Sequence, residues 1–210
     1  MDNSVHATQP VALARMRGAH RFEVFSLKLK RRLTFDRRSA VDEWIVLESD
    51  PTVRVFCERP GYVQFGGHRF LADFQVCYAD RQELLLLHDP VAVDNGKPHA
   101  ELDANAVTVR LLEPAELAAS RIWIDNWQRM LPCLIATRDL VPTSLLNAVE
   151  RFVATAQSLL AIEREFSTGD PVVARAAVFA LLHAGRVSAP ELRTEPLSWL
   201  TRFAAAEARP

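Results

Sequence analysis

Three side chains between residues 39 and 88 carry groups that metal-assisted hydrolysis needs, namely Glu43, Asp73 and His88. Asp73 interrupts an apolar stretch, and a buried carboxylate is unfavourable unless it is paired, hydrogen-bonded or bound to a metal. Mg²⁺ prefers oxygen ligands from a few carboxylates, with water and phosphate completing its shell. Glu43 and Asp73 are therefore the candidate metal ligands. His88 could orient water, contact phosphate or ligate a borderline metal.

Each of these residues also has an ordinary structural explanation. Asp73 could lie near the end of a strand and reach solvent or a loop amide, and Glu43 could be a solvated helix residue. His88 could be a polar residue beside the Asp89-Pro90 turn. The choice depends on how the secondary structure positions the three side chains.

The segment around Glu43 has the pattern of a capped helix. Ser39 is a suitable N-cap residue with Asp42 three positions later, and apolar residues follow at helical spacing. Asp50-Pro51 is expected to end this helix. A strand is predicted next, over residues 52–57, because they are rich in β-branched and aromatic types.

Two hairpins follow in the prediction. Gly66-Gly67 is a two-residue turn signal that joins strands over residues 62–65 and 68–74, with Phe65 opposite His68. Both glycines accept the positive φ angles that such tight turns require.

The second hairpin is predicted to turn at Asp80-Arg81. This turn sets Asp73 opposite His88 and Gln75 opposite Leu86. Residues directly opposite one another share a face of the sheet. We therefore expect Asp73 and His88 to converge at one end of the sheet, where Glu43 would join them.

The remaining chain is predicted to be mostly helical. Residues 84–87 are all leucine, which is typical of a central strand buried on both faces, and a further strand is predicted over 106–112. Helices are expected over 114–130, 144–165, 171–184, 188–192 and 196–203, with Gly185 as a C-cap. The expected organisation is an α/β protein with a tail at 1–20, a core at 21–113, a helical extension at 114–168 and a small helical unit at 169–210. Helix, glycine and helix also match a helix-turn-helix, but the second helix is poor in Lys and Arg, which favours a packing unit.

Positive charge is concentrated at the start of the chain. Residues 1–40 hold nine Lys or Arg and three acids, so the rest of a chain with net charge −1 carries −7. Such a segment can contact a polyanion, although many such runs are only solvated. The candidate DNA-binding residues share this segment and are Lys28, Lys30, Arg31, Arg32, Arg37 and Arg38.

Composition limits the class of protein. Hydrophobic residues make up 49% and charged residues 24%, as in globular domains, and no apolar run approaches the length of a bilayer span. The polar N-terminus lacks a signal-peptide core, so we expect a cytoplasmic protein without a membrane partner. Three widely spaced cysteines, Cys57, Cys77 and Cys133, indicate buried thiols in a reducing compartment.

Several of these segments together resemble the TnsA-type endonuclease subunit of heteromeric transposases. The similar segments are Ser39 to Glu43, Leu47 to Val53, Glu58-Arg59-Pro60, Arg69 to Phe74 and Glu83 to His88. The resemblance covers roughly residues 22 to 112. It implies a restriction-endonuclease-like core, a mixed sheet flanked by helices, followed by a helical, DNA-associated C-terminal unit. It also implies Mg²⁺ or Mn²⁺ as cofactor, with double-stranded DNA and an integrase-type transposase as partners.

The resemblance assigns roles to individual positions. Glu43 matches the helix glutamate and Asp73 the strand aspartate, both of which would hold the metal. Leu86 and His88 stand where the family has Glu or Gln and Lys, and leucine cannot ligate a hard cation. Three functions therefore stay open. They are a metal-dependent endonuclease with an incomplete catalytic motif, a DNA-binding module of the same fold, and a helical adaptor without a nucleic acid role.

Overall fold

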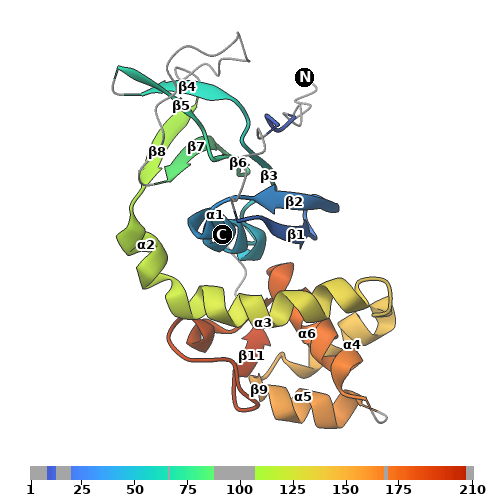
Figure 1. Cartoon of the computed structure of the whole chain (residues 1–210). Helices are drawn as coiled ribbons and strands as arrows, with labels where there is room; N and C mark the ends of the chain where they lie inside the picture. Colours follow the sequence, from blue (N-terminus) through green and yellow to red (C-terminus); the bar gives the residue numbers. More distant parts are fainter. Residues whose placement is uncertain (1–8, 13–19, 66, 88–106, 168–169, 207–210) are drawn as a thin grey trace. The chain divides into compact units, whose positions relative to one another are not determined.

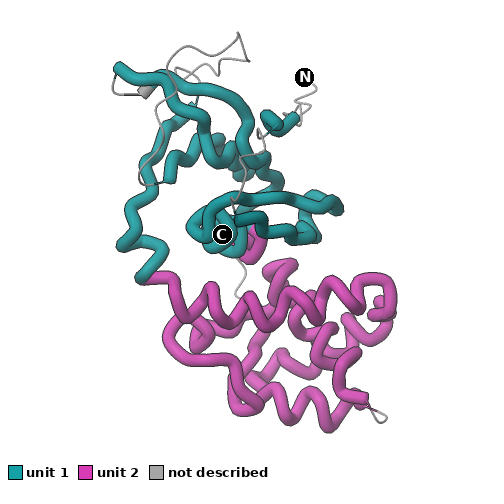
Figure 2. Tube along the Cα trace, in the orientation of Figure 1, with its two compact units in different colours: residues 1–47, 52–118 teal, residues 48–51, 119–210 magenta. Residues whose placement is uncertain are grey.

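The computed structural model describes residues 9–12, 20–65, 67–87, 107–167 and 170–206, and these form a mixed α/β protein (Figure 1). Contacts divide the chain into two compact units, one of residues 1–47 with 52–118 and the other of residues 48–51 with 119–210 (Figure 2). The elements up to residue 119 are β1 (Phe22–Ser26), β2 (Arg31–Phe35), α1 (Arg38–Ser49), β3 (Val55–Glu58), β4 (Tyr62–Phe65), β5 (His68–Leu71), β6 (Phe74–Cys77), β7 (Gln82–Leu87), β8 (Thr108–Leu112) and α2 (Pro114–Ala119).

The first unit is built on a four-stranded mixed sheet of order β3-β6-β7-β8. β3, β6 and β7 are antiparallel neighbours, whereas β8 runs parallel to β7. Residues Leu84 to Leu87 of β7 are all buried, which confirms the prediction of a central strand covered on both faces.

Aromatic side chains pack α1 and the β1-β2 hairpin against one face of this sheet. The ring centroids of Trp44 and Phe35 lie 6.5 Å apart, and Phe35 lies 5.8 Å from Phe74 of β6. Phe56 of β3 meets Phe74 edge-on at 6.3 Å. We call this face of the sheet the α1 face. The helix itself begins at Arg38, so Ser39 lies in its first turn and is not the N-cap.

The β4-β5 hairpin covers the opposite face. Its Val63 forms a buried cluster with Ala72, Leu84 and Leu86, against which Phe70 packs. The register predicted from Gly66-Gly67 is confirmed, with Phe65 opposite His68 and Val63 opposite Phe70. The strand expected over residues 68–74 is instead divided, because β5 pairs with β4 while β6 pairs with β3 and β7.

The predicted register between β6 and β7 is wrong by two residues. Phe74 lies opposite Leu85, whereas the predicted register would pair it with Leu87, and Asp73 lies at a bend outside this ladder. The Tyr78 N–H donates to the Arg81 carbonyl at 2.9 Å, so the hairpin turns one residue earlier than predicted. The Arg81 guanidinium also stacks over the Tyr78 ring at 4.0 Å, which favours this turn over one centred on Arg81. His88 itself lies outside the described residues.

The second unit is mainly helical, with a small three-stranded sheet. Its elements are α3 (Arg121–Thr137), α4 (Thr143–Phe152), β9 (Gln157–Ser158), α5 (Leu159–Phe166), α6 (Val172–His183), β10 (Val187–Ser188), the 3-10 helix η1 (Pro190–Arg193) and β11 (Arg202–Ala205). β11 lies between β9 and β10, so the helix predicted over 196–203 is not present. The predicted helix over 114–130 is divided at Ser120, and the one over 144–165 is divided by β9.

α6 is the best predicted helix of this unit. Gly185 follows it with φ +71°, and the N–H groups of Gly185 and Arg186 donate to the Leu182 and Leu181 carbonyls, which is a Schellman C-cap. The helix-turn-helix alternative fails, because only the short η1 follows α6. α6 packs on α3, α4 and α5, so the ranges 114–168 and 169–210, which we expected to be separate, share one compact unit from residue 119 onward.

Two further expectations concern the whole described chain. None of its described helices combines the length and the apolar character needed to cross a membrane. Cys57, Cys77 and Cys133 are free thiols, and the first two are buried.

Candidate metal centre and nucleic-acid interface

Asp73 lies where the chain bends between β5 and β6, and its carboxylate is nearly enclosed. Its side chain is 11% exposed. The Leu87 N–H donates to Oδ2 at 2.8 Å, and the Arg37 guanidinium donates to Oδ1. Burial raises the pKa of Asp73, while the charge of Arg37 and the Leu87 amide act in the opposite direction. Both carboxylate oxygens are thus already bonded within the protein.

Glu43 lies on α1 and is buried. Its pKa is raised to about 8, chiefly by burial, with the negative charges of Glu116 and Asp73 adding to the effect. The Arg110 guanidinium acts in the opposite direction but does not cancel it. In the absence of a bound cation, Glu43 is therefore mostly protonated at neutral pH.

The α1 face of the sheet brings these groups together. Leu85 lies opposite Phe74 on that face, and Arg110 of β8 lies beside Leu85 in the parallel register. Arg37, the residue before α1, bonds Asp73, the residue before β6, so the N-terminal end of the helix that carries Glu43 lies beside Asp73. The structure adds two cations that we had not predicted there, Arg37 beside Asp73 and Arg110, whose charge acts on Glu43.

Residues 84–87 of β7 contribute no oxygen ligand on either face. Leu84 and Leu86 face the β4-β5 hairpin, while Leu85 and Leu87 face α1. Leu86, which the resemblance matches to a catalytic carboxylate or amide, consequently points into a hydrophobic cluster. No carboxylate or amide side chain takes that position on either face of the strand, because residues 84–87 are all leucine.

The described residues do not fit a resident divalent cation. No three His, Cys, Asp or Glu side chains in the described part of the chain gather as a metal shell would require. Asp73 already accepts from Arg37 and Leu87, and Glu43 is mostly neutral. We therefore derive no hydrolytic step through a metal at this site.

Most of the candidate DNA-binding cations are bonded within the first unit. Lys28 donates to the Leu47 and Val53 carbonyls at 2.8 and 3.0 Å, next to the C-terminal end of α1. Arg37 pairs with Asp73, and Arg38 pairs with Asp42 one helical turn along α1 at 2.9 Å. These contacts give the three cations structural partners.

Arg31 and Arg32 are neighbours with opposite environments. The Arg31 guanidinium binds both carboxylate oxygens of Glu58, at 2.7 and 2.5 Å. Arg32 is exposed, as is Lys30 in the preceding turn, and neither has an ion pair with another described residue. Among the six candidates, Lys30 and Arg32 are the ones that remain available to an external anion.

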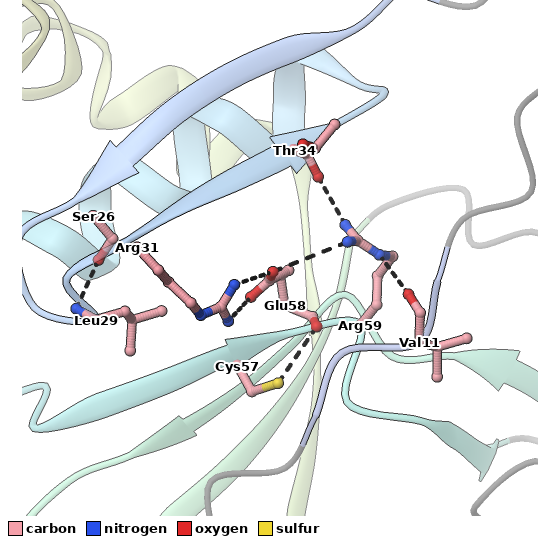
Figure 3. Close-up of polar contacts among 8 residues, drawn as sticks. All are labelled: Val11, Ser26, Leu29, Arg31, Thr34, Cys57, Glu58 and Arg59. Carbon is pink, nitrogen blue, oxygen red and sulfur yellow. Dashed lines mark hydrogen bonds and ion pairs between the residues drawn. The ribbon is translucent and has the colours of Figure 1, made fainter.

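The Glu58 carboxylate is the centre of a buried polar network (Figure 3). Glu58 is 2% exposed and is held by Arg31, with Arg59 at 4.0 Å. Arg59 has φ +47° and donates side-chain hydrogen bonds to the Val11 carbonyl at 3.0 Å and the Thr34 carbonyl at 2.9 Å. Sequence reasoning identified Glu58-Arg59-Pro60 only as part of a family resemblance, and its structural role was missed.

This network also supports the bend at Asp73. The Arg59 N–H donates to the Asp73 carbonyl at 2.8 Å, and the Asp73 N–H donates to the Leu85 carbonyl at 2.9 Å. The unusual backbone of Arg59 is thus part of the arrangement that holds Asp73 beside β7. Positive φ in a residue other than glycine is uncommon and often marks a constrained site.

Comparison with known proteins leaves the family open. No protein-family model matches the chain, and no curated protein is significantly similar to it.

Proposed function

We propose that this protein is a TnsA-like subunit of a transposition system, which binds double-stranded DNA and an integrase-type transposase through a restriction-endonuclease-like core. One observation carries the proposal. Arg37, directly before the Glu43 helix α1, bonds Asp73, directly before β6, so this helix and this strand of a mixed sheet begin side by side. This is the arrangement that the resemblance implies for such a core.

The same site supports DNA binding more strongly than DNA cleavage. Leucines occupy residues 84–87 of β7, and Arg37 bonds the one carboxylate that could begin a metal shell. Without a metal site, the core can bind DNA through its charges, but the part of it that the structure describes has no group that would cleave it. We therefore propose a DNA-binding module in which Mg²⁺-dependent or Mn²⁺-dependent cleavage is weak or absent.

The exposed cations of the β1-β2 hairpin are the proposed phosphate contacts. Lys30 lies in its turn with φ +53°, and Arg32 projects from β2 opposite Phe25. Phosphate contacts of this kind contribute affinity without sequence preference and weaken as salt increases. Arg31 is excluded from this role, because its guanidinium neutralises the buried Glu58.

A matched pair of variants tests this assignment. In the double variant Lys30→Gln, Arg32→Gln, we expect weaker binding to duplex DNA of any sequence, with a salt slope reduced by about 2. Fluorescence anisotropy at several salt concentrations measures both quantities. Arg31→Gln should instead lower the unfolding free energy by about 1–3 kcal/mol, because it leaves Glu58 unpaired. Wild-type protein that does not bind DNA, or binds with no salt dependence, would refute the proposal.

An adaptor without a nucleic acid role is the competing function. The second unit exposes two adjacent apolar side chains, Trp199 at 64% and Leu200 at 76%, and exposed tryptophan is common at protein interfaces. An absence of salt-dependent DNA binding, together with partner binding that Trp199→Ala abolishes, would favour this function.

A further inference from the structure

We infer that internal arginines, above all Arg37, have replaced the divalent metal ion in this core. The inference depends on the nuclease-like core of the proposed function and concerns how its acidic site is neutralised. It states that the folded protein holds Asp73 without a metal ion and has no divalent-cation site at that residue.

The first observation is the set of contacts around the Asp73 carboxylate. A divalent cation at this residue would need a lone pair of the carboxylate that the surrounding residues leave open to it. Here the Arg37 guanidinium takes Oδ1 and the Leu87 amide takes Oδ2. The Arg37 side chain is also 37% exposed, so it reaches the Asp73 carboxylate from the protein surface. A metal ion entering from solvent would have to approach along the same route.

The second observation is a further guanidinium on the α1 face. Arg110 forms an ion pair with Glu116 and is the main positive charge acting on Glu43. Arginine stays protonated under all ordinary conditions, so Arg37 gives Asp73 a permanent positive charge, while the charge of Arg110 is shared between Glu116 and Glu43.

The third observation is the apolar surroundings of the acidic residues. Leu85 and Leu87 occupy the α1 face of β7 and are 1% exposed each. A hydrated cation would have to be enclosed by these side chains, which cannot replace its lost water. The planar guanidinium of Arg37 instead pairs directly with Asp73 and needs no water shell at that contact.

A calorimetric titration of the full chain with Mn²⁺, in the absence of DNA, tests the inference. For wild type we expect no saturable binding that depends on Asp73, so wild type and Asp73→Asn should give the same isotherm at millimolar Mn²⁺. The melting temperature of wild type should be the same in EDTA and in Mg²⁺. Binding that is present in wild type and lost in Asp73→Asn would overturn the inference.

Two arginine variants add a positive expectation. Arg37→Ala leaves Asp73 buried without its cation and should lower the melting temperature by about 5 °C or more. Arg121→Ala is the control, since its pair with Asp125 is an exposed intrahelical contact, and it should change the melting temperature little. The double variant Arg37→Ala, Leu87→Glu should gain saturable Mn²⁺ binding.

Equal melting temperatures for Arg37→Ala and wild type would count against the inference. The wild-type titration decides the question even where a variant fails to fold. Because no DNA is present, failure of DNA binding would refute the proposed function and leave this result unchanged.

Discussion

At the scale of single residues, three acidic side chains of the first unit are buried, or nearly so, in two different ways. Glu58 is paired with Arg31, Asp73 is paired with Arg37, and Glu43 is mostly neutral because its pKa is raised to about 8. A buried charge is tolerated only when it is paired or neutralised, and each residue follows one of these routes. The two paired residues, Glu58 and Asp73, support the sheet near the start of β6. Glu43 makes the stability of the folded protein depend on pH.

Glu43 should make the protein less stable in mildly alkaline solution. Its pKa is higher in the folded state than the ordinary 4.5, so the folded protein binds the extra proton between pH 4.5 and about 8. The stabilisation is complete below the unfolded pKa and is lost as pH rises through the folded pKa. We expect the unfolding free energy to fall by about 1.4 kcal/mol per pH unit across this window from Glu43 alone.

Urea unfolding of wild type and Glu43→Gln between about pH 5 and pH 8.5 measures this effect. The variant should have the flatter pH profile and should exceed wild type in stability at the alkaline end. Glu113→Gln, at an exposed position, is the control and should keep the wild-type profile. Parallel profiles for wild type and Glu43→Gln would contradict the prediction.

At the scale of elements, the turns and caps depend on glycines with quite different surroundings. Gly185 ends α6 with φ +71°, and an added Cβ would lie 2.6 Å from Pro51 Cβ. Gly67 turns the β4-β5 hairpin with φ +82°, and an added Cβ would meet nothing within 4 Å. Both glycines adopt the left-handed backbone conformation. Only at Gly185 would a side chain also collide with a neighbouring residue.

The two glycines therefore form a matched pair for mutation. Gly67→Ala should cost about 1 kcal/mol, the usual penalty for an L-residue in the left-handed region. Gly185→Ala should cost about 1–3 kcal/mol more, because α6 or Pro51 must move to admit the methyl group. Denaturant unfolding of both variants gives the comparison. Equal losses would mean that the contact with Pro51 adds nothing.

At the scale of the whole molecule, charge is distributed unevenly between the first segment and the remainder. Residues 1–40 carry a surplus of six positive charges in a chain whose net charge is −1. The structure places much of this surplus in internal pairs, with Glu58, Asp73 and Asp42 as partners. Any DNA affinity should consequently be moderate and strongly salt-dependent, because few phosphate contacts remain available.

The complete protein should also be a poor nuclease. One missing electrostatic stabiliser usually costs about 10²- to 10³-fold in rate, and β7 lacks the carboxylate position altogether between residues 84 and 87. In supercoiled-plasmid assays with Mg²⁺ or Mn²⁺, wild type should nick DNA no faster than Asp73→Ala. Robust nicking by wild type that disappears in Asp73→Ala would establish an active metal-dependent enzyme.

Local sequence determined several elements of this protein because their signals act over a few residues. Gly66-Gly67 predicted the register of β4 and β5, four successive leucines predicted the central strand β7, and Gly185 predicted the end of α6. Turn chemistry, burial on both faces and helix capping are local properties, so they can be read without the fold.

Other features were decided only by tertiary structure. The β6-β7 hairpin turns one residue earlier than Asp80-Arg81, which shifts the register of the two strands by two residues. The short strand β11 replaced a predicted helix, because it pairs with β9 and β10 from distant parts of the chain. Arg31 and Arg32 are indistinguishable by type and neighbourhood, yet one neutralises Glu58 and the other is exposed. Such outcomes depend on contacts between residues far apart in sequence, and no local pattern encodes which arginine will meet which carboxylate.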